Sequence, residues 1–479
     1  MRLSELLAAK QLVSQHDLEK AVVRQQREGG RVIDNLVALK LVSTETVEEL
    51  QRTAPVAPAT VADTGLKPDY LLKFVAKMMV VQGTETIGEL RDTLKLPASV
   101  ITGLLSEGVT RKLVEQFGSA IPGHSNESRF RLTHAGKSFA ADALAQNQYV
   151  GPVPVTLNAY REQVFKQAIG SEIATPAKVK AAFSDMVVSE EFVRRVGPSL
   201  NSGKSLLLYG PPGNGKTTIA EKIGTIYEDV IFVPYCIEVA GDIITIFDSN
   251  IHEVVVETES SPDTLDLRRE EVDRRWAPCR RPMVITGGEL TLSMLDLKFN
   301  AIAKFYEAPL HVKAQGGVFV IDDFGRQIVK PEELLNRWIV PLERRVDFLK
   351  LHTGKQFEIP FDQLVIFSTN LTPNDLMDGA FLRRIPYKLE VDGPSEAEFT
   401  EILSRICAAK KIPATADDVA DVVAALKSVE GKPLACYQAK FVVDQIVSAC
   451  RFLGTQPQFS HDLVADAVAN MYAKSSQSA

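Results

Sequence analysis

The segment Ser205–Thr218, with the sequence SLLLYGPPGNGKTT, limits what this chain can fold into more than any other stretch. Leu206–Tyr209 has the apolar character of a buried strand, three glycines follow it, and a helical pattern begins at Ile219. This is the phosphate-loop pattern G-x-x-x-x-G-K-[ST] between a strand and a helix. Glycines let consecutive backbone N–H groups curl around a polyphosphate without obstruction by a Cβ atom. We therefore predict a phosphate-binding loop.

Each residue type in this loop suits a bound nucleotide. Lys216 is expected to reach the β- and γ-phosphates of ATP, and the Thr217 hydroxyl is expected to bind Mg²⁺. The helix that follows directs its positive end at the anion. ATP and Mg²⁺ are therefore the predicted cofactors. The residues predicted to bind the nucleotide are Gly210, Pro211, Pro212, Gly213, Asn214, Gly215, Lys216, Thr217 and Thr218.

Length and composition indicate an ordinary multidomain protein. A chain of 479 residues corresponds to about three or four domains. The net charge of −7 argues against a protein that mainly coats nucleic acid or an anionic membrane. Five scattered cysteines without zinc spacing are typical of reduced thiols in the cytosol. We find no secretory signal pattern and no apolar run approaching the roughly 18 residues of a membrane span, so we expect a cytoplasmic protein.

Two acids follow a second apolar strand. Val318–Ile321 is wholly apolar and is followed by Asp322 and Asp323. A buried parallel strand has this pattern, and its carboxyl end places the acids beside a nucleotide. Asp322 is expected to hold Mg²⁺ through its water shell, and Asp323 is expected to orient the attacking water. The alternative is a buried strand that ends in a solvated acid pair.

A third apolar strand and a pair of arginines complete the predicted site. Leu364–Thr369 is followed by Asn370, which can align the water or the γ-phosphate. Arg383 and Arg384 come just before a strand at Tyr387–Val391. Exposed adjacent arginines are usually only solvated. In an oligomeric ATPase, one of them can reach the γ-phosphate bound by the neighbouring subunit.

The order of these motifs resembles that of an AAA+ ATPase, over residues 160 to 475. Details such as Gly316-Gly317 before the acid-ended strand are similar to magnesium chelatase and enhancer-binding activators. The resemblance implies an α/β fold, with a P-loop AAA+ core and parallel sheet over 160–392 and a helical lid over 393–479. It also implies an ATP hydrolase that assembles as a homo-oligomeric ring or spiral, expected to be a hexamer, with catalytic roles for Asp323, Asn370, Arg383 and Arg384.

The chain departs from the AAA+ pattern in two places. Most relatives have Asp-Glu where this chain has Asp322-Asp323, so its second carboxylate is one methylene shorter. The lid offers no arginine for the nucleotide, and Lys432 and Lys440 are the basic residues available there. An alternative function is therefore an assembly scaffold in which ATP binds and hydrolysis is slow.

Residues 1–52 contain two similar units. Arg2-Leu3 recurs as Arg31-Val32, and each unit is expected to form two short helices with a turn capped by Ser14 or Ser43. The pattern resembles the N-terminal domain of type II secretion and type IV pilus assembly ATPases, some of which bind cyclic di-GMP. Ser4 and Gln11 stand where that family usually has glycine, which favours docking of a protein partner over cyclic di-GMP.

A second module is predicted at residues 67–147, after a linker at Gln51–Gly65. Three helices followed by a two-stranded ribbon resemble a winged helix. Its third helix, Ala98–Glu107, has no basic residue, which makes it a poor reader of base edges and phosphates. We therefore favour a protein-interaction module over a DNA-binding regulator.

An unusual segment lies between the phosphate loop and the acid-ended strand, at Asn250–Leu297. It has an acidic loop at Glu257–Pro262, followed by six arginines: Arg268, Arg269, Arg274, Arg275, Arg280 and Arg281. We interpret it as a solvated helix face whose acids neutralise the arginines. The alternative is a surface that faces another subunit or the pore of a ring.

Overall fold

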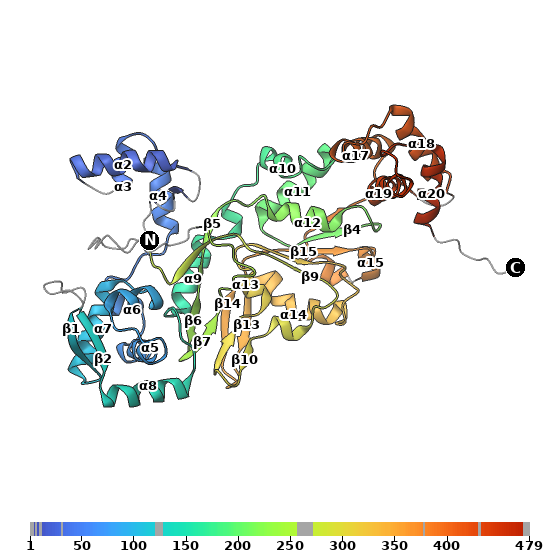
Figure 1. Cartoon of the computed structure of the whole chain (residues 1–479). Helices are drawn as coiled ribbons and strands as arrows, with labels where there is room; N and C mark the ends of the chain where they lie inside the picture. Colours follow the sequence, from blue (N-terminus) through green and yellow to red (C-terminus); the bar gives the residue numbers. More distant parts are fainter. Residues whose placement is uncertain are drawn as a thin grey trace.

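Five parallel strands form the central sheet of the computed structural model, in the order β16-β4-β15-β12-β9 (Figure 1). They are β4 (Leu206–Tyr209), β9 (Met283–Thr286), β12 (Val318–Ile321), β15 (Leu364–Thr369) and β16 (Tyr387–Glu390). The register pairs Ile321 with both Phe367 and Thr286, and Thr369 with Tyr209. The carboxyl ends of β4, β12 and β15 are therefore level, so the residues that follow these strands meet at one edge.

Helices cover both faces of this sheet because successive strand residues point to opposite sides. The described residues are 4, 7–8, 12–29, 32–119, 128–255, 272–376, 379–429 and 433–472. Leu206 and Leu208 pack with α10 (Pro176–Ala182), α11 (Glu190–Ser202) and α12 (Lys216–Gly224). Leu207 lies in the opposite core with the fully buried Trp338 of α14 (Pro331–Arg344). The wholly apolar strands predicted from the sequence are thus buried on both faces.

A second sheet is assembled from three separate stretches of chain. Its strand order is β10-β11-β7-β6-β3. The strands are β3 (Val155–Thr156), β6 (Cys236–Val239), β7 (Asp242–Thr245), β10 (Lys298–Asn300) and β11 (Phe305–Glu307). An antiparallel pair lies beside it, formed by β5 (Val230–Pro234) and β8 (Trp276–Arg280). These strands are insertions on both sides of β9, together with one strand that precedes the core.

A hairpin from the core reaches the second sheet. It consists of β13 (Val346–Lys350) and β14 (Gln356–Pro360) and follows α14 directly. His352, in the turn of the hairpin, stacks on Phe299 of β10 with ring centroids 4.1 Å apart, and its ring nitrogen is hydrogen-bonded to the Tyr306 hydroxyl of β11. The two sheets are therefore joined through side chains as well as through the backbone.

The N-terminal helices are α2 (Gln15–Glu28), α3 (Val32–Ala38) and α4 (Thr44–Thr53). Both predicted caps are confirmed: the Ser14 hydroxyl accepts from Asp17 N–H at 3.2 Å and the Ser43 hydroxyl from Thr46 N–H at 3.1 Å. The predicted repeat arginines, Arg2 and Arg31, lie outside the described residues.

The second module has the predicted order of three helices, a ribbon and a final helix (Figure 1). Its elements are α5 (Pro68–Val81), α6 (Ile87–Leu94), α7 (Ala98–Thr110), β1 (Val114–Ser119), β2 (Ser128–Leu132) and α8 (His134–Gln146). The segment predicted to be a linker is packed in place. Ala57 is buried, and the Ser99 hydroxyl of α7 donates to Ala59 O at 3.0 Å.

The interpretation of the arginine segment is wrong for its described part. Arg280 ends the strand β8 and is exposed, but Arg274, Arg275 and Arg281 are buried. Their ion-pair partners are the carboxylates of Asp92, Asp273 and Glu172, at 3.0, 2.8 and 3.0 Å respectively. Asp273, one of the acids expected to neutralise the arginines, pairs with Arg275, whereas Arg274 and Arg281 pair with acids from distant segments of the chain. The predicted acidic loop, Arg268 and Arg269 lie outside the described residues.

Four helices form the lid at the opposite end of the molecule from the N-terminal helices (Figure 1). They are α17 (Glu396–Ala409), α18 (Ala416–Lys427), α19 (Cys436–Leu453) and α20 (His461–Met471), close to the predicted bounds. They enclose a core of their own around Phe399, Val422 and Val442. Among the described residues, no helix combines the length and the hydrophobicity needed to cross a bilayer.

Candidate nucleotide-binding site

The phosphate loop connects β4 to α12 and has the backbone conformation that only glycine readily adopts. Gly210, Gly213 and Gly215 have φ angles of 139°, 82° and 81°. A Cβ atom on Gly210 would lie 2.5 Å from the carbonyl oxygen of Val391. The loop is therefore fixed between its own strand and the end of β16. Pro211, Pro212 and Thr218 are exposed along it.

Lys216 is the first residue of α12 and is buried to 7% exposure. Its Nζ donates to the carbonyl oxygens of Gly210 and Pro211, each at 2.9 Å, and to Asn370 Oδ1 at 2.6 Å. Burial lowers the pKa of Lys216, while the nearby carboxylates of Asp322 and Asp323 oppose that shift. The ammonium group therefore lies between the loop and the two predicted acids.

The predicted metal and catalytic side chains are adjacent to this lysine. The Thr217 hydroxyl donates to Asp322 Oδ2 at 2.8 Å, and Asn370 Nδ2 donates to Asp323 Oδ1 at 3.2 Å. A hydroxyl beside a carboxylate supplies the oxygen ligands that Mg²⁺ takes. Residues from β4–α12, β12 and β15 thus form one group, as the sequence order predicted.

One residue of this group could not be found from the sequence. Gln327 lies five residues after Asp322, and its amide nitrogen donates to Asp322 O at 2.9 Å and to Asp323 O at 3.2 Å. Its side-chain oxygen accepts from Gly325 N–H at 2.8 Å. A glutamine in a loop carries no motif, so these contacts are visible only in three dimensions.

The two candidate arginines differ in their surroundings. Arg384 donates to Glu343 Oε1 at 2.7 Å and lies 5.6 Å from the centre of the Phe381 ring. Arg383 is exposed, and it has no ion-pair partner among the described residues. Of the two, only Arg383 therefore leaves its side chain exposed.

The lid reaches the phosphate loop through the first turn of α19. Tyr437 N–H donates to Gly213 O at 2.9 Å, and Cys436 N–H donates to Asn214 Oδ1 at 3.2 Å. A Cβ on Gly213 would lie 2.3 Å from the Tyr437 ring. Of the two lid lysines considered from the sequence, Lys440 is exposed on α19 and Lys432 lies outside the described residues.

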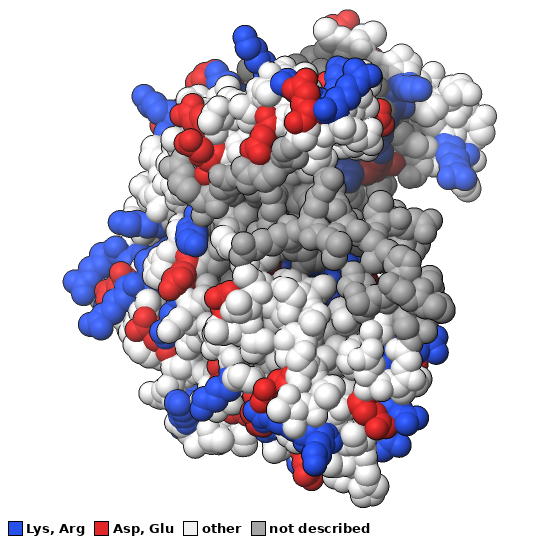
Figure 2. Space-filling model, turned by 90° about the vertical axis from the view of Figure 1, so that its left-hand side faces the viewer, with Lys and Arg blue, Asp and Glu red and all other residues white. Residues whose placement is uncertain are grey.

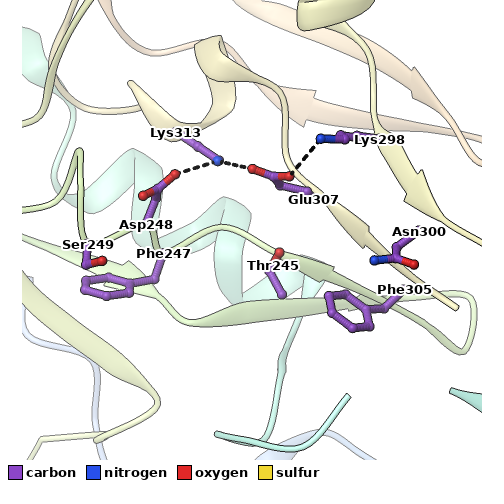
Figure 3. A pocket seen from close by; sticks show the side chains of 9 residues that line it. All are labelled: Thr245, Phe247, Asp248, Ser249, Lys298, Asn300, Phe305, Glu307 and Lys313. Carbon is purple, nitrogen blue, oxygen red and sulfur yellow. Dashed lines mark hydrogen bonds and ion pairs between the residues drawn. The ribbon is translucent and has the colours of Figure 1, made fainter. Parts of the chain in front are cut away.

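A separate hollow of about 490 Å³ lies on the second sheet (Figure 3). A row of charged side chains crosses it: Asp248, Lys313, Glu307 and Lys298. Lys313 Nζ is 2.8 Å from Asp248 and 2.6 Å from Glu307, and Lys298 is 4.0 Å from Glu307. The charges in this row satisfy one another, so the hollow offers no unbalanced charge to recognise a ligand.

The second module offers little to a nucleic acid. Arg111, at the end of α7, is 2.7 Å from Glu107 and 3.2 Å from Asp69. The face shown in Figure 2 has basic and acidic side chains mixed among the described residues rather than gathered by sign. Phosphate contacts require uncompensated basic groups, and the described part of α7 supplies none.

Comparison with known proteins adds a family match to the lid. Residues 395–470 match a family model described as a domain of unknown function, DUF8689. No curated protein matches the chain. Among solved structures, the chain is similar to a RuvB mutant from Thermotoga maritima, at 16% identity and a TM-score of 0.33, with 63% of this chain and 72% of that chain covered. It is also similar to NtrX from Brucella abortus, at 14% identity and a TM-score of 0.37, with 72% of this chain and 69% of that chain covered.

The architecture itself defines the fold class. In a parallel five-stranded sheet, the phosphate loop follows β4 and the two acids follow β12, which is separated from β4 by β15. A helical lid continues from β16, the last strand in the chain. The predicted α/β class, with a phosphate loop on a parallel sheet and a helical lid, is confirmed.

Proposed function

We propose that this protein binds and hydrolyses Mg-ATP at the subunit interfaces of a homo-oligomer and uses the cycle to remodel or drive a protein partner. One observation carries the proposal: Lys216, Asn370 and Asp323 form a continuous hydrogen-bonded chain, and Thr217 and Asp322 are paired beside it. Phosphoryl transfer needs mainly positioned charges, and these are the groups that supply them.

Each side chain has a distinct role in this proposal. Lys216 and the loop N–H groups bind the β- and γ-phosphates, and Thr217 and Asp322 hold Mg²⁺, which would neutralise developing phosphate charge. Asp323 accepts a hydrogen bond from the attacking water, and Asn370 fixes the Asp323 carboxylate. Lys216 would exchange one of its three present contacts for a phosphate oxygen when the nucleotide binds.

Arg383 completes the site from the neighbouring subunit. Its exposure and its lack of an ion-pair partner among the described residues support this role, whereas Arg384 is engaged with Glu343. The N-terminal modules are the parts that dock the partner, because they lie apart from the nucleotide site (Figure 1). A secretion, pilus or signalling protein is the class of partner that the repeat in residues 1–52 suggests.

The first experiment measures phosphate release by the purified protein, by a Lys216→Ala variant and by a Lys204→Ala control. Lys204 is an exposed lysine just before β4. We expect the first substitution to abolish release and the second to leave it unchanged. Equal release from all three would remove the ATPase proposal. Binding of a fluorescent ATP analogue without phosphate release would instead support the alternative of an assembly scaffold with slow hydrolysis, which the short Asp323 side chain favours.

The shared site is tested by mixing two inactive variants. Lys216→Ala lacks the lysine of the phosphate loop, and Arg383→Ala lacks the arginine given to the neighbour. In mixed oligomers, some interfaces combine an intact loop with an intact arginine, so we expect turnover to reappear. A mixture as inactive as its components would show that each site is formed within one subunit.

A further inference from the structure

We propose that Gln327 is a positioning residue for hydrolysis, which sets the orientation of the Asp323 carboxylate through the backbone. This inference rests on the proposed ATPase function. The hydrogen-bond partners of the Gln327 side chain are the peptide groups of the turn after β12, not the carboxylates of Asp322 and Asp323.

The contacts of Gln327 fix both peptide groups that flank Asp323. Its amide nitrogen donates to Asp322 O, which belongs to the peptide before Asp323, at 2.9 Å. The same nitrogen donates to Asp323 O, which belongs to the peptide after it, at 3.2 Å. Holding these two planes determines φ and ψ of Asp323. A flipped amide would place its oxygen against two carbonyl oxygens, so the contacts also select one orientation of the glutamine.

The backbone of Asp323 requires such a brace. Its φ angle is +48°, in the left-handed region that residues other than glycine adopt at a cost. Strained backbone persists where the surrounding structure enforces it, and it is concentrated at functional sites. The turn is also closed by Arg326 N–H, which donates to Asp323 O at 2.9 Å. Without Gln327, the peptide after Asp323 would keep the bond from Arg326 N–H and the bond from Phe324 N–H to Ser368 O at 2.7 Å, but Asp322 O would lose its side-chain donor.

The short side chain makes this backbone geometry important. Asp323 has one methylene fewer than the glutamate common in the AAA+ pattern, so the position of its carboxylate depends more closely on the backbone. The carboxylate is now 3.2 Å from Asn370 Nδ2. A shift of about 1 Å at a reacting group can cost on the order of 10²-fold in rate.

The test compares Gln327→Met with Gln356→Met, a matched change at an exposed glutamine of the hairpin. We expect kcat for ATP hydrolysis to fall by about 10- to 100-fold in Gln327→Met. We expect the affinity for a fluorescent ATP analogue to stay unchanged, since the contacts of Lys216 and Thr217 are intact. Gln327→Glu, which keeps the acceptor for Gly325 N–H but not the two donated bonds, should show the same loss, and it replaces the methionine variant if that one does not fold.

A double variant separates positioning from a general structural role. In the Asp323→Ala background there is no carboxylate to position, so adding Gln327→Met should not lower the residual rate further. A further loss of rate in the double variant, or a Gln327→Met enzyme with the kcat of the unsubstituted protein, would overturn the inference. Either result would leave the ATPase proposal intact. If the unsubstituted protein releases no more phosphate than Lys216→Ala, both fail together.

Discussion

Arg383 and Arg384 are identical neighbours in the chain that have different surroundings. The Arg384 side chain is 14% exposed and forms an ion pair with Glu343, whereas Arg383 is exposed. In the proposed shared site, the arginine that reaches another subunit cannot also be held by its own. The difference gives two variants of equal chemistry with opposite expected effects.

We predict that Arg383→Ala lowers ATP turnover by about 10³-fold, the lower range for an arginine supplied in trans. Its melting temperature should stay unchanged. Arg384→Ala should instead reduce the free energy of unfolding by roughly 1 kcal/mol, from the lost ion pair and cation–π contact. Turnover assays and thermal melts on both variants check this. The reverse pattern would assign the shared site to Arg384.

Lys77 is a charged residue in an unusually apolar position. It is 2% exposed, its Nζ donates to Tyr149 O at 2.6 Å and to Asn147 Oδ1 at 2.8 Å, and it lies 4.9 Å from the Phe74 ring centre. Burial lowers the pKa of Lys77 from 10.5 to about 8. Between these pH values the unfolded chain binds a proton that the folded chain does not, so stability must rise with pH there.

We predict that the free energy of unfolding of the unsubstituted protein, minus that of Lys77→Met, rises by about 3 kcal/mol between pH 8 and pH 10.5, since one pKa unit corresponds to about 1.4 kcal/mol. Taking the difference removes the titration of other groups. Denaturant melts at four or five pH values would measure it. A flat difference would mean that the ammonium keeps its ordinary pKa in the fold.

At the scale of elements, a buried ion-pair network joins α13 (Leu310–Lys313), α14 and the hairpin. Asp347 of β13 accepts from His311 Nε2 at 2.8 Å and from Arg337 Nη1 at 2.6 Å. Burial alone would raise the pKa of Asp347, but the hydrogen bonds from His311 and Arg337 outweigh it and hold the pKa well below its usual range. The hairpin is therefore anchored to the helix that follows the acid turn.

We predict that Arg337→Leu destabilises the fold by about 3–5 kcal/mol, because it leaves a buried carboxylate with one fewer cation. The double variant Arg337→Leu with Asp347→Leu should recover part of this loss, since no buried charge is then unpaired. Urea melts of the two variants measure both effects. A double variant less stable than the single one would contradict this account.

The elements of the core could be predicted from the sequence, but the supports between them could not. The strands before Asp322 and Asn370 are continuous apolar runs, which are typical of buried parallel strands. Parallel strands bring their carboxyl ends to one edge of the sheet. Gln327, the Tyr437–Gly213 contact and the buried Arg281 depend on contacts between residues distant in the chain or on the shape of a turn. Arg281 in particular looked solvated because its partner Glu172 precedes it by 109 residues.

At the scale of the whole molecule, Arg281 ties the segment before the core to β12, the strand that precedes Asp322 and Asp323. It is 8% exposed, its Nε donates to Glu172 at 3.0 Å, and its Nη1 donates to Gly316 O at 2.7 Å, just before β12. Glu172 in turn accepts from Glu228 N–H at 2.7 Å. One guanidinium therefore holds three distant stretches together.

We predict that Arg281→Met lowers the free energy of unfolding by about 3–5 kcal/mol, because the buried Glu172 carboxylate then keeps only the half-exposed Lys178, at 3.4 Å, as a cation. Arg280→Met, a neighbouring change at an exposed arginine, should cost less than about 1 kcal/mol. Chemical denaturation of both variants measures the contrast. Similar small losses would show that Lys178 and the backbone donors are enough to satisfy Glu172.

The second sheet has a consequence for the order in which the protein folds during synthesis. Its strands β3, β6, β7, β11 and β10 span residues 155 to 307, and β9 of the core lies between the two insertions. Contacts between segments far apart in the chain form late, because a long loop must close first. The second module can fold as it leaves the ribosome, but the second sheet stays incomplete until residue 307 has been made. A nascent chain stalled before that point would expose the apolar face of β6 and β7, which makes this interval the one in which a chaperone is most needed.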